Sequence, residues 1–256
     1  MKRWFLLSSV FVVVLAAVFA VTLPAAMVWR WIGDRAPQIK LHGINGTLWA
    51  GEAARFSARG MNLGKLTWTL SPWTLWRGEV DSRLALDGEG LHLTGKVHKR
   101  ADGGLQISEL TGDAQASWLA PALAIPVLEP SGRLTVSGAK LHLDPHGLPR
   151  DVDARVVWQE AGVRGQVMAR FGTITIDARG QDGRITMTIE DGGDGELEVH
   201  GKVDLDQRNY RSEIILNART AEGPVVEALK WIGAPRAEGG RFLLIEGHLL
   251  LSEPTP

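Results

Sequence analysis

The chain has 256 residues, room for one or two domains of ordinary size, with 28 basic residues against 29 acidic ones. The formal net charge of −1 argues against a nucleic-acid-binding protein, because neutralising phosphates requires a surplus of clustered cations. Cysteine is absent, which excludes disulfides, thiolate zinc sites, iron–sulfur clusters and a cysteine nucleophile. Ten tryptophans stand against one tyrosine, and seven of them precede residue 77.

The positive charge gathers around an apolar segment at the beginning of the chain. Residues 1–40 carry a net charge of +4, which leaves −5 for the rest, and the 26 residues 4–29 hold no charge at all. About 20 apolar residues let a helix cross the hydrocarbon core of a bilayer. We therefore expect a cytoplasmic head of residues 1–3, a transmembrane anchor over 4–29 and a juxtamembrane linker over 30–40. Pro24 is expected to kink the helix or mark its exit.

The side chains around this segment suit a membrane interface. Trp4, Trp29 and Trp31 stand near its ends, where interfacial aromatics are common, and Arg30 follows it directly. Only three residues precede the segment, so we expect the body to lie in the periplasm or an equivalent compartment. Two alternatives stay open, namely a signal peptide cleaved after residues 18–20 and a helix buried in a soluble fold.

Beyond residue 40 the sequence shows the two-residue alternation that is typical of half-buried strands. Leu197 and Val199, for example, share one face of a run whose other face is polar. Asp-Gly pairs bracket many runs and suit tight turns, because glycine accepts a positive φ. Many of the runs between glycines have only five to seven residues. We predict a mainly β fold over residues 41–256, as an antiparallel meander sheet or a partly open barrel.

One or two short helices are expected to interrupt the strands. Residues 223–233 have Pro224 near the start and Gly233 just past the end, with an apolar stripe between them. Residues 116–123 are a second candidate, although Pro121 breaks it. Prolines cluster from there onward, which suggests that the β domain has two halves joined near residues 121–131.

Tests for catalytic or metal chemistry favour structural interpretations. Residues 90–96 have the spacing of a phosphate loop, but leucines alternate there as in a strand and no helix follows. His142, Asp144 and His146 have some metal-ligand character, yet Pro145 prevents a helical pair. Carboxylate pairs of the kind found on solvated strand faces occur at Asp151 and Asp153, Glu196 and Glu198, and Asp204 and Asp206. We predict a non-enzymatic protein with no catalytic residue, metal or cofactor.

The informative motifs lie in the tryptophan-rich front of the body. Residues 46–51 read Gly-Thr-Leu-Trp-Ala-Gly, and Trp68, Trp73 and Trp76 follow soon afterwards. Tryptophan anchors both protein cores and interfaces. Two interpretations therefore stay open: the rings pack within the sheet, or some of them face a partner or lipid.

These motifs resemble the type II secretion system protein N family, bitopic inner-membrane proteins of Gram-negative secretion machines. The Gly-Thr-Leu-Trp-x-Gly motif is the most specific part, whereas residues 100–220 agree in length rather than in motif. The positions that carry the likeness are residues 22–25, the motif positions Gly46, Thr47, Leu48, Trp49 and Gly51, residues 64–78, residues 229–233 and residues 240–247.

The resemblance implies a single-pass accessory component of the inner-membrane assembly platform, with a periplasmic β domain beside membrane lipids and partners such as proteins C, L and M. It brings no catalytic residues, and the motif positions are expected to be mainly structural. Exposed sheet edges are natural docking sites for such partners. An alternative is a membrane-anchored lipid-handling protein, similar to the AsmA family, in which the apolar sheet face lines a groove for acyl chains.

Overall fold

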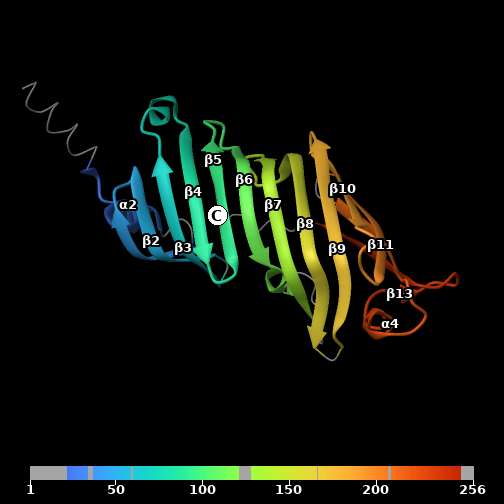
Figure 1. Cartoon of the computed structure of the whole chain (residues 1–256). Coiled ribbons are helices and arrows are strands. Elements are labelled where there is room, and N and C mark those ends of the chain that lie inside the picture. The colour runs from blue at the N-terminus through green and yellow to red at the C-terminus, as the bar shows by residue number, and fades with distance from the viewer. Residues whose placement is uncertain are drawn as a thin grey trace, which may run out of the picture. The chain divides into compact units, whose positions relative to one another are not determined.

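The computed structural model describes residues 22–33, 37–58, 60–120, 128–165, 167–206 and 209–248. They form antiparallel β sheet with few helices, which confirms the mainly β meander (Figure 1). None of the helices in these ranges is long and apolar enough to span a bilayer. The predicted anchor over residues 4–29 lies outside the described residues, except for residues 22–29.

The chain divides into two compact units, residues 1–89 and 90–256. The joint predicted near residues 121–131 falls largely outside the described ranges, which omit residues 121–127. Within the first unit the strands pair antiparallel with their chain neighbours, from β1 through β4. Its described elements are α2 (Ala25–Ile32), β1 (Ile39–Gly46), β2 (Ala50–Ala58), β3 (Met61–Leu70), the 3-10 helix η2 (Thr74–Arg77) and β4 (Val80–Gly88).

The second unit is also a meander, in which the strands from β5 to β12 pair antiparallel with their chain neighbours. β14 then pairs with β12, and β13 pairs with the other side of β14. The elements are β5 (Leu91–Lys99), β6 (Leu105–Gln115), the 3-10 helix η3 (Ala116–Leu119), β7 (Leu128–Leu143), β8 (Pro149–Gly165), β9 (Ala169–Gln181), β10 (Arg184–Asp191), β11 (Leu197–Asp206), β12 (Asn209–Ala218), α4 (Pro224–Leu229), β13 (Ala234–Pro235) and β14 (Arg241–His248).

The strands are longer than the expected runs of five to seven residues. β7 has 16 residues and β8 has 17, because both continue through glycines. Their pairing shifts register between Ser131 and Arg133, where Gly132 has a φ of 103°. A β-bulge absorbs an extra residue in this way and leaves the ladder intact on either side, so a glycine inside a strand marks a bulge rather than an end.

The turns predicted from Asp-Gly pairs agree with the structure better than the predicted strand lengths do. Asp182 and Gly183 join β9 to β10 with φ values of 54° and 83°, the two positive angles that a tight type I′ hairpin requires. The glycine–lysine pattern of residues 90–96 belongs largely to strand β5, in keeping with the leucine alternation.

The core of the second unit lies between α4 and one face of the sheet. The helix predicted within residues 223–233 is present as α4, which begins with Pro224 and buries Val225, Ala228 and Leu229. The buried sheet residues that complete this cluster are Leu128, Ala161, Val163, Ala169, Phe171, Ile174, Leu197, Val199 and Leu216. The second predicted helix is present as the 3-10 helix η3, which ends at Leu119.

Candidate interaction surfaces

The Gly-Thr-Leu-Trp-Ala-Gly motif forms the turn between β1 and β2, and it fastens the residues before α2 to the sheet. The Leu48 N–H donates to the Leu23 carbonyl at 2.9 Å, and Pro24 forms a β-bridge with Thr47. Pro24 has extended backbone angles, φ −66° and ψ 130°, so α2 begins afresh at Ala25. The end of the N-terminal apolar segment is therefore tied to this turn.

We call residues 46–51 the motif turn. Trp68, on the neighbouring strand β3, contacts this turn. Its indole N–H lies 3.3 Å from the Thr47 carbonyl oxygen and 3.2 Å from that of Leu48. The ring lies against Gly51, where an added Cβ would stand 2.6 Å from the Trp68 ring atom Cζ2. Trp68 is half-buried, and both its ring and its polar atom are used within the fold.

The other two candidate partner-facing aromatics lie in the connection between β3 and β4. Trp73 is 81% exposed and Trp76 is 90% exposed, and Leu75 between them is 38% exposed. We call residues 73–77 the aromatic turn. The sequence did not distinguish these rings from Trp68, but the structure separates a ring that packs on the sheet from two that lie in water.

The predicted membrane-interface residues within the described ranges lie in α2. Trp31 is 61% exposed and Arg30 is exposed. Trp29 is half-buried, and its indole ring covers Gly33, where an added Cβ would stand 3.2 Å from Cε2. Trp4 lies outside the described residues.

β14 has an open outer edge at the end of the second unit's strand order. β12 pairs with all of β14, residues 241–248. Within the part of the chain that the structure describes, the other side of β14 meets only the two-residue β13, opposite Arg241 and Phe242. No described strand pairs with residues 243–248 on this side, and Leu244 and Ile245 are 47% and 42% exposed there.

The apolar face of the second unit's sheet is only partly covered. α4 packs over β9 and β12. Ile176, which packs against the core cluster, lies opposite Val156, and Val156 lies opposite Val136. All three side chains are half-buried, so Val156 and Val136 continue this face beyond Ile176 with apolar surface that is partly exposed.

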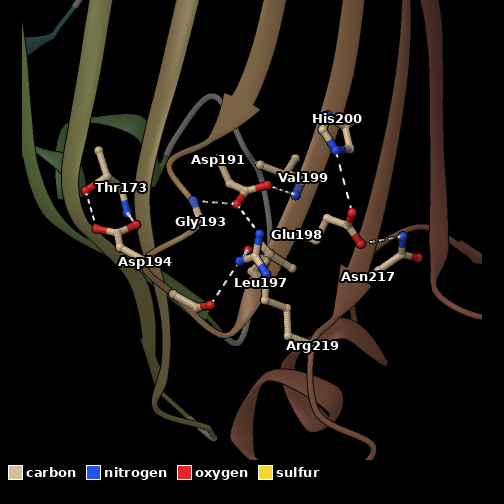
Figure 2. Close-up of polar contacts among 11 residues, drawn as sticks. Thr173, Asp191, Gly193, Asp194, Leu197, Glu198, Val199, His200, Asn217 and Arg219 are labelled. Carbon is tan, nitrogen blue, oxygen red and sulfur yellow. Dashed lines mark hydrogen bonds and ion pairs between the residues drawn. The ribbon is translucent and has the colours of Figure 1, made fainter.

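A polar network holds the connection between β10 and β11 (Figure 2). The Asp191 side chain is 4% exposed, pairs with Arg219, and accepts the N–H groups of Gly193 and Val199, each at 2.9 Å. Arg219 also donates to two carbonyl oxygens of this connection, at 2.9 and 2.7 Å. Burial raises the pKa of Asp191, but the hydrogen bonds from Arg219 and the two backbone N–H groups outweigh burial and lower the pKa below its ordinary value.

Asp194 fastens the same connection to β9. Its carboxylate accepts both the backbone N–H and the hydroxyl of Thr173, each at 2.7 Å (Figure 2). These bonds lower the pKa of Asp194. The Asp-Gly pairs predicted a turn here, but Arg219 carries no local signal because it lies 28 residues from its partner Asp191. We interpret this network as structural, since its donors and acceptors satisfy one another.

Several of the histidine and carboxylate candidates have partners within the fold. Asp144 accepts the N–H groups of His146 at 2.8 Å and Leu148 at 2.9 Å, which closes the turn between β7 and β8. His142 Nδ1 lies 2.9 Å from an Asp151 carboxylate oxygen, and this hydrogen bond is the main cause that lowers the pKa of Asp151. No group of three potential metal ligands occurs among the described residues.

An open hollow lies beside the ends of β11, β12 and β14. Arg211 within it already pairs with Glu213 at 2.6 Å and with Glu246 at 3.0 Å. The lining residues are Asp204, Asp206, Asn209, Tyr210, Arg211, Glu246 and Gly247.

Comparison with known proteins identifies the relatives of the chain. The model of the family described as "Type II secretion system (T2SS), protein N" matches residues 37–243. A Vibrio cholerae serotype O1 protein named Type II secretion system protein N is 26% identical over 215 residues, which cover 78% of this chain and 81% of the relative. An Aeromonas hydrophila protein of the same name is 35% identical over 99 residues, 38% of this chain and 39% of that relative. No solved structure matches the chain significantly.

Proposed function

Because this chain belongs to the type II secretion system protein N family, we propose that it serves the secretion machinery as a non-enzymatic, membrane-anchored accessory component of the inner-membrane assembly platform. Residues 1–3 lie in the cytoplasm, the apolar segment within residues 4–29 crosses the inner membrane once, and residues 30–40 link it to a periplasmic β domain of residues 41–256. The observation that carries the proposal is the family match over residues 37–243.

Pro24 bears on where the proposed anchor ends. Because the backbone is extended at Pro24 and α2 begins at Ala25, we propose that the spanning part lies within residues 4–23. This length is close to the ~20 residues that a helix needs to cross the hydrocarbon core. The exposed Arg30 and Trp31 of α2 then lie beside the lipid headgroups, where cations and tryptophans are favourable.

The open outer edge of β14 supports docking on partner proteins. Its unpaired N–H and C=O groups suit the addition of a strand from another chain. Leu244 and Ile245 alternate across the edge and supply an exposed apolar side chain on each face of the sheet. On the grounds of the family, the partners are secretion proteins C, L and M.

Lysine substitutions on the outer edge of β14 test the docking directly. Lysine on an edge strand is a device by which sheet proteins prevent strand addition. We expect Leu244→Lys and Ile245→Lys, each in the full chain and in cells with a complete secretion system, to lose most of the co-purification with proteins C, L and M. Met168→Lys is the matched control, because Met168 is 71% exposed but lies between β8 and β9, away from the edge. Equal recovery of partners with all three variants contradicts edge docking.

A second function, lipid handling, is favoured by the partly covered apolar face of the second unit. Val136 and Val156, which continue this face beyond the core residue Ile176, then lie against acyl chains. Mass spectrometry of the full chain purified in detergent discriminates the two functions. Phospholipid at a stoichiometric ratio favours lipid handling, and its absence favours assembly.

A further inference from the structure

The aromatic turn, residues 73–77, exposes more aromatic surface than the fold requires. Trp73 and Trp76 are the two most exposed large apolar side chains among the described residues. Burying the apolar surface of two indole rings would be favourable compared with leaving it in water, and exposed apolar surface of this kind marks an interaction site. Arg77 follows them, is exposed, and makes no ion pair with any residue that the structure describes.

The backbone of the aromatic turn is held firmly. The Thr74 hydroxyl donates to the Ser71 carbonyl at 3.1 Å and accepts the Asp81 N–H at 3.3 Å. Gly78 closes η2 in the left-handed conformation, φ 71°, and its N–H donates to the Leu75 carbonyl at 3.0 Å. The rings are therefore displayed by an ordered turn, which lowers the entropy cost of binding through them.

The topology places the aromatic turn at one particular end of the first unit. β1 runs into the motif turn, β2 leaves it, and β3 returns to it, since the Leu70 N–H donates to the Trp49 carbonyl at 2.6 Å. The aromatic turn follows immediately, at the tip of β3 (Figure 1). The bond from Leu48 to Leu23 brings the end of the N-terminal apolar segment to the same end of the sheet.

We propose that the aromatic turn is a second lipid-contact site, in which Trp73, Leu75 and Trp76 enter the headgroup region of the bilayer that holds the anchor. The proposal rests on the membrane anchor of the proposed function. Lipid is the occupant because the turn follows β3 at the sheet end where Leu23, in the last part of the N-terminal apolar segment, is bonded to Leu48. Its composition fits, since tryptophan favours the headgroup level and the exposed Arg77 is attracted to anionic lipid.

A second attachment to the bilayer, in addition to the anchor, restricts how the first unit can rotate. A single helix and linker leave a domain free to rotate above the membrane, whereas a second contact at the same sheet end fixes which surfaces face away from the lipid. The aromatic turn therefore sets the orientation of the first unit's sheet on the bilayer.

The absence of cysteine makes the test direct, because one introduced cysteine carries one probe. Trp73→Cys and Trp76→Cys are labelled with an environment-sensitive fluorophore in the full chain, reconstituted in vesicles of phosphatidylethanolamine and phosphatidylglycerol. Met61→Cys is the matched control, because Met61 is 43% exposed and lies at the opposite end of β3. We expect blue-shifted emission at positions 73 and 76, with several-fold stronger quenching by nitroxide lipids labelled near the headgroup than at position 61.

Three other outcomes would refute the second lipid contact, and one of them would also refute the anchor. Equal lipid quenching at the three positions, in protein that stays with the vesicles, refutes the second lipid contact and leaves the anchor intact. A blue shift without lipid quenching shows that protein covers the turn, and also refutes it. Failure of the full chain to stay with the vesicles refutes the anchor, and the second contact falls with it.

Discussion

At the residue scale, the close contact between Gly51 and Trp68 explains why the motif turn requires glycine. A side chain at position 51 would meet both the Trp68 ring and the Asn45 carbonyl oxygen at 2.6 Å. Gly46 is confined in a similar way, with a φ of 88° and the Ala50 carbonyl oxygen 2.6 Å from an added Cβ. The glycines permit a close approach between strands, and the tryptophan fills the space that they leave.

Gly51→Ala tests this packing. The added methyl group must displace the Trp68 ring or the backbone of β1, so we expect a loss of about 1–3 kcal/mol in unfolding free energy. Urea unfolding monitored by tryptophan fluorescence measures it. Gly95→Ala is the control, because an added Cβ there meets Leu110 at an ordinary 3.4 Å. Equal stability of the two variants contradicts the close packing of the motif turn.

Asp191 gives the fold a defined pH dependence. Its folded pKa lies below the ordinary carboxyl value of about 4. The carboxylate therefore contributes stability that is fully present above that value and is lost as the pH falls through the lowered folded pKa. We expect Asp191→Asn to cost about 1.5–3 kcal/mol at neutral pH and to flatten the loss of stability on acidification.

Urea unfolding at neutral and at acidic pH measures this difference. Asp206→Asn is the matched control, because Asp206 is 66% exposed and lies 3.8 Å from its partner Arg184. It should leave the acid dependence almost unchanged, since exposed ion pairs contribute little. An acid slope of Asp191→Asn as steep as that of the wild type would show that Asp191 is not the titrating group.

At the scale of elements, α4 closes the core of the second unit with only six residues. So short a helix has little stability of its own, so its packing against β9 and β12 must hold it. Val225 and Ala228 are fully buried, and Leu229 is 5% exposed. The same sheet face remains partly exposed at Val156 and Val136.

Leu229→Ala tests the contribution of α4. We expect it to lower the unfolding free energy by about 2–4 kcal/mol, because a buried leucine loses its transfer free energy and leaves a cavity. Trp231→Ala, two residues later and 54% exposed, is the control and should change stability little. Chemical denaturation measures the unfolding free energy of both variants. A small effect of Leu229→Ala would mean that α4 is not part of the core.

Local signals in the sequence predicted individual elements well. Pro224 and the apolar stripe after it predicted α4, and Asp182 with Gly183 predicted a hairpin, because these residues act on their own backbone. The strand lengths were underestimated, since Gly132 sits in a bulge that only the pairing with β8 reveals. A glycine that ends a strand and one that passes through a bulge look alike without the partner strand.

Long-range contacts limited what the sequence could predict at the scale of the whole molecule. Arg219 reaches Asp191 across 28 residues, and Leu48 joins Leu23 through backbone atoms that leave no side-chain pattern. Trp68 and Trp76 look equivalent in the sequence, but one lies on a strand beside Gly51 and the other at the tip of a turn. The family membership was predictable because its motif is local.

We propose that a single uncleaved anchor holds the β domain on the periplasmic side of the inner membrane. Labelling of Met168→Cys with a membrane-impermeant maleimide tests it, in spheroplasts of cells that express the otherwise cysteine-free full chain. Met168 is 71% exposed, so its labelling depends on which side of the membrane the domain faces. We expect labelling in intact spheroplasts of a protein that stays in the membrane fraction with its N-terminus intact. Labelling only after the inner membrane is permeabilised, or release of a shortened soluble protein, would contradict it.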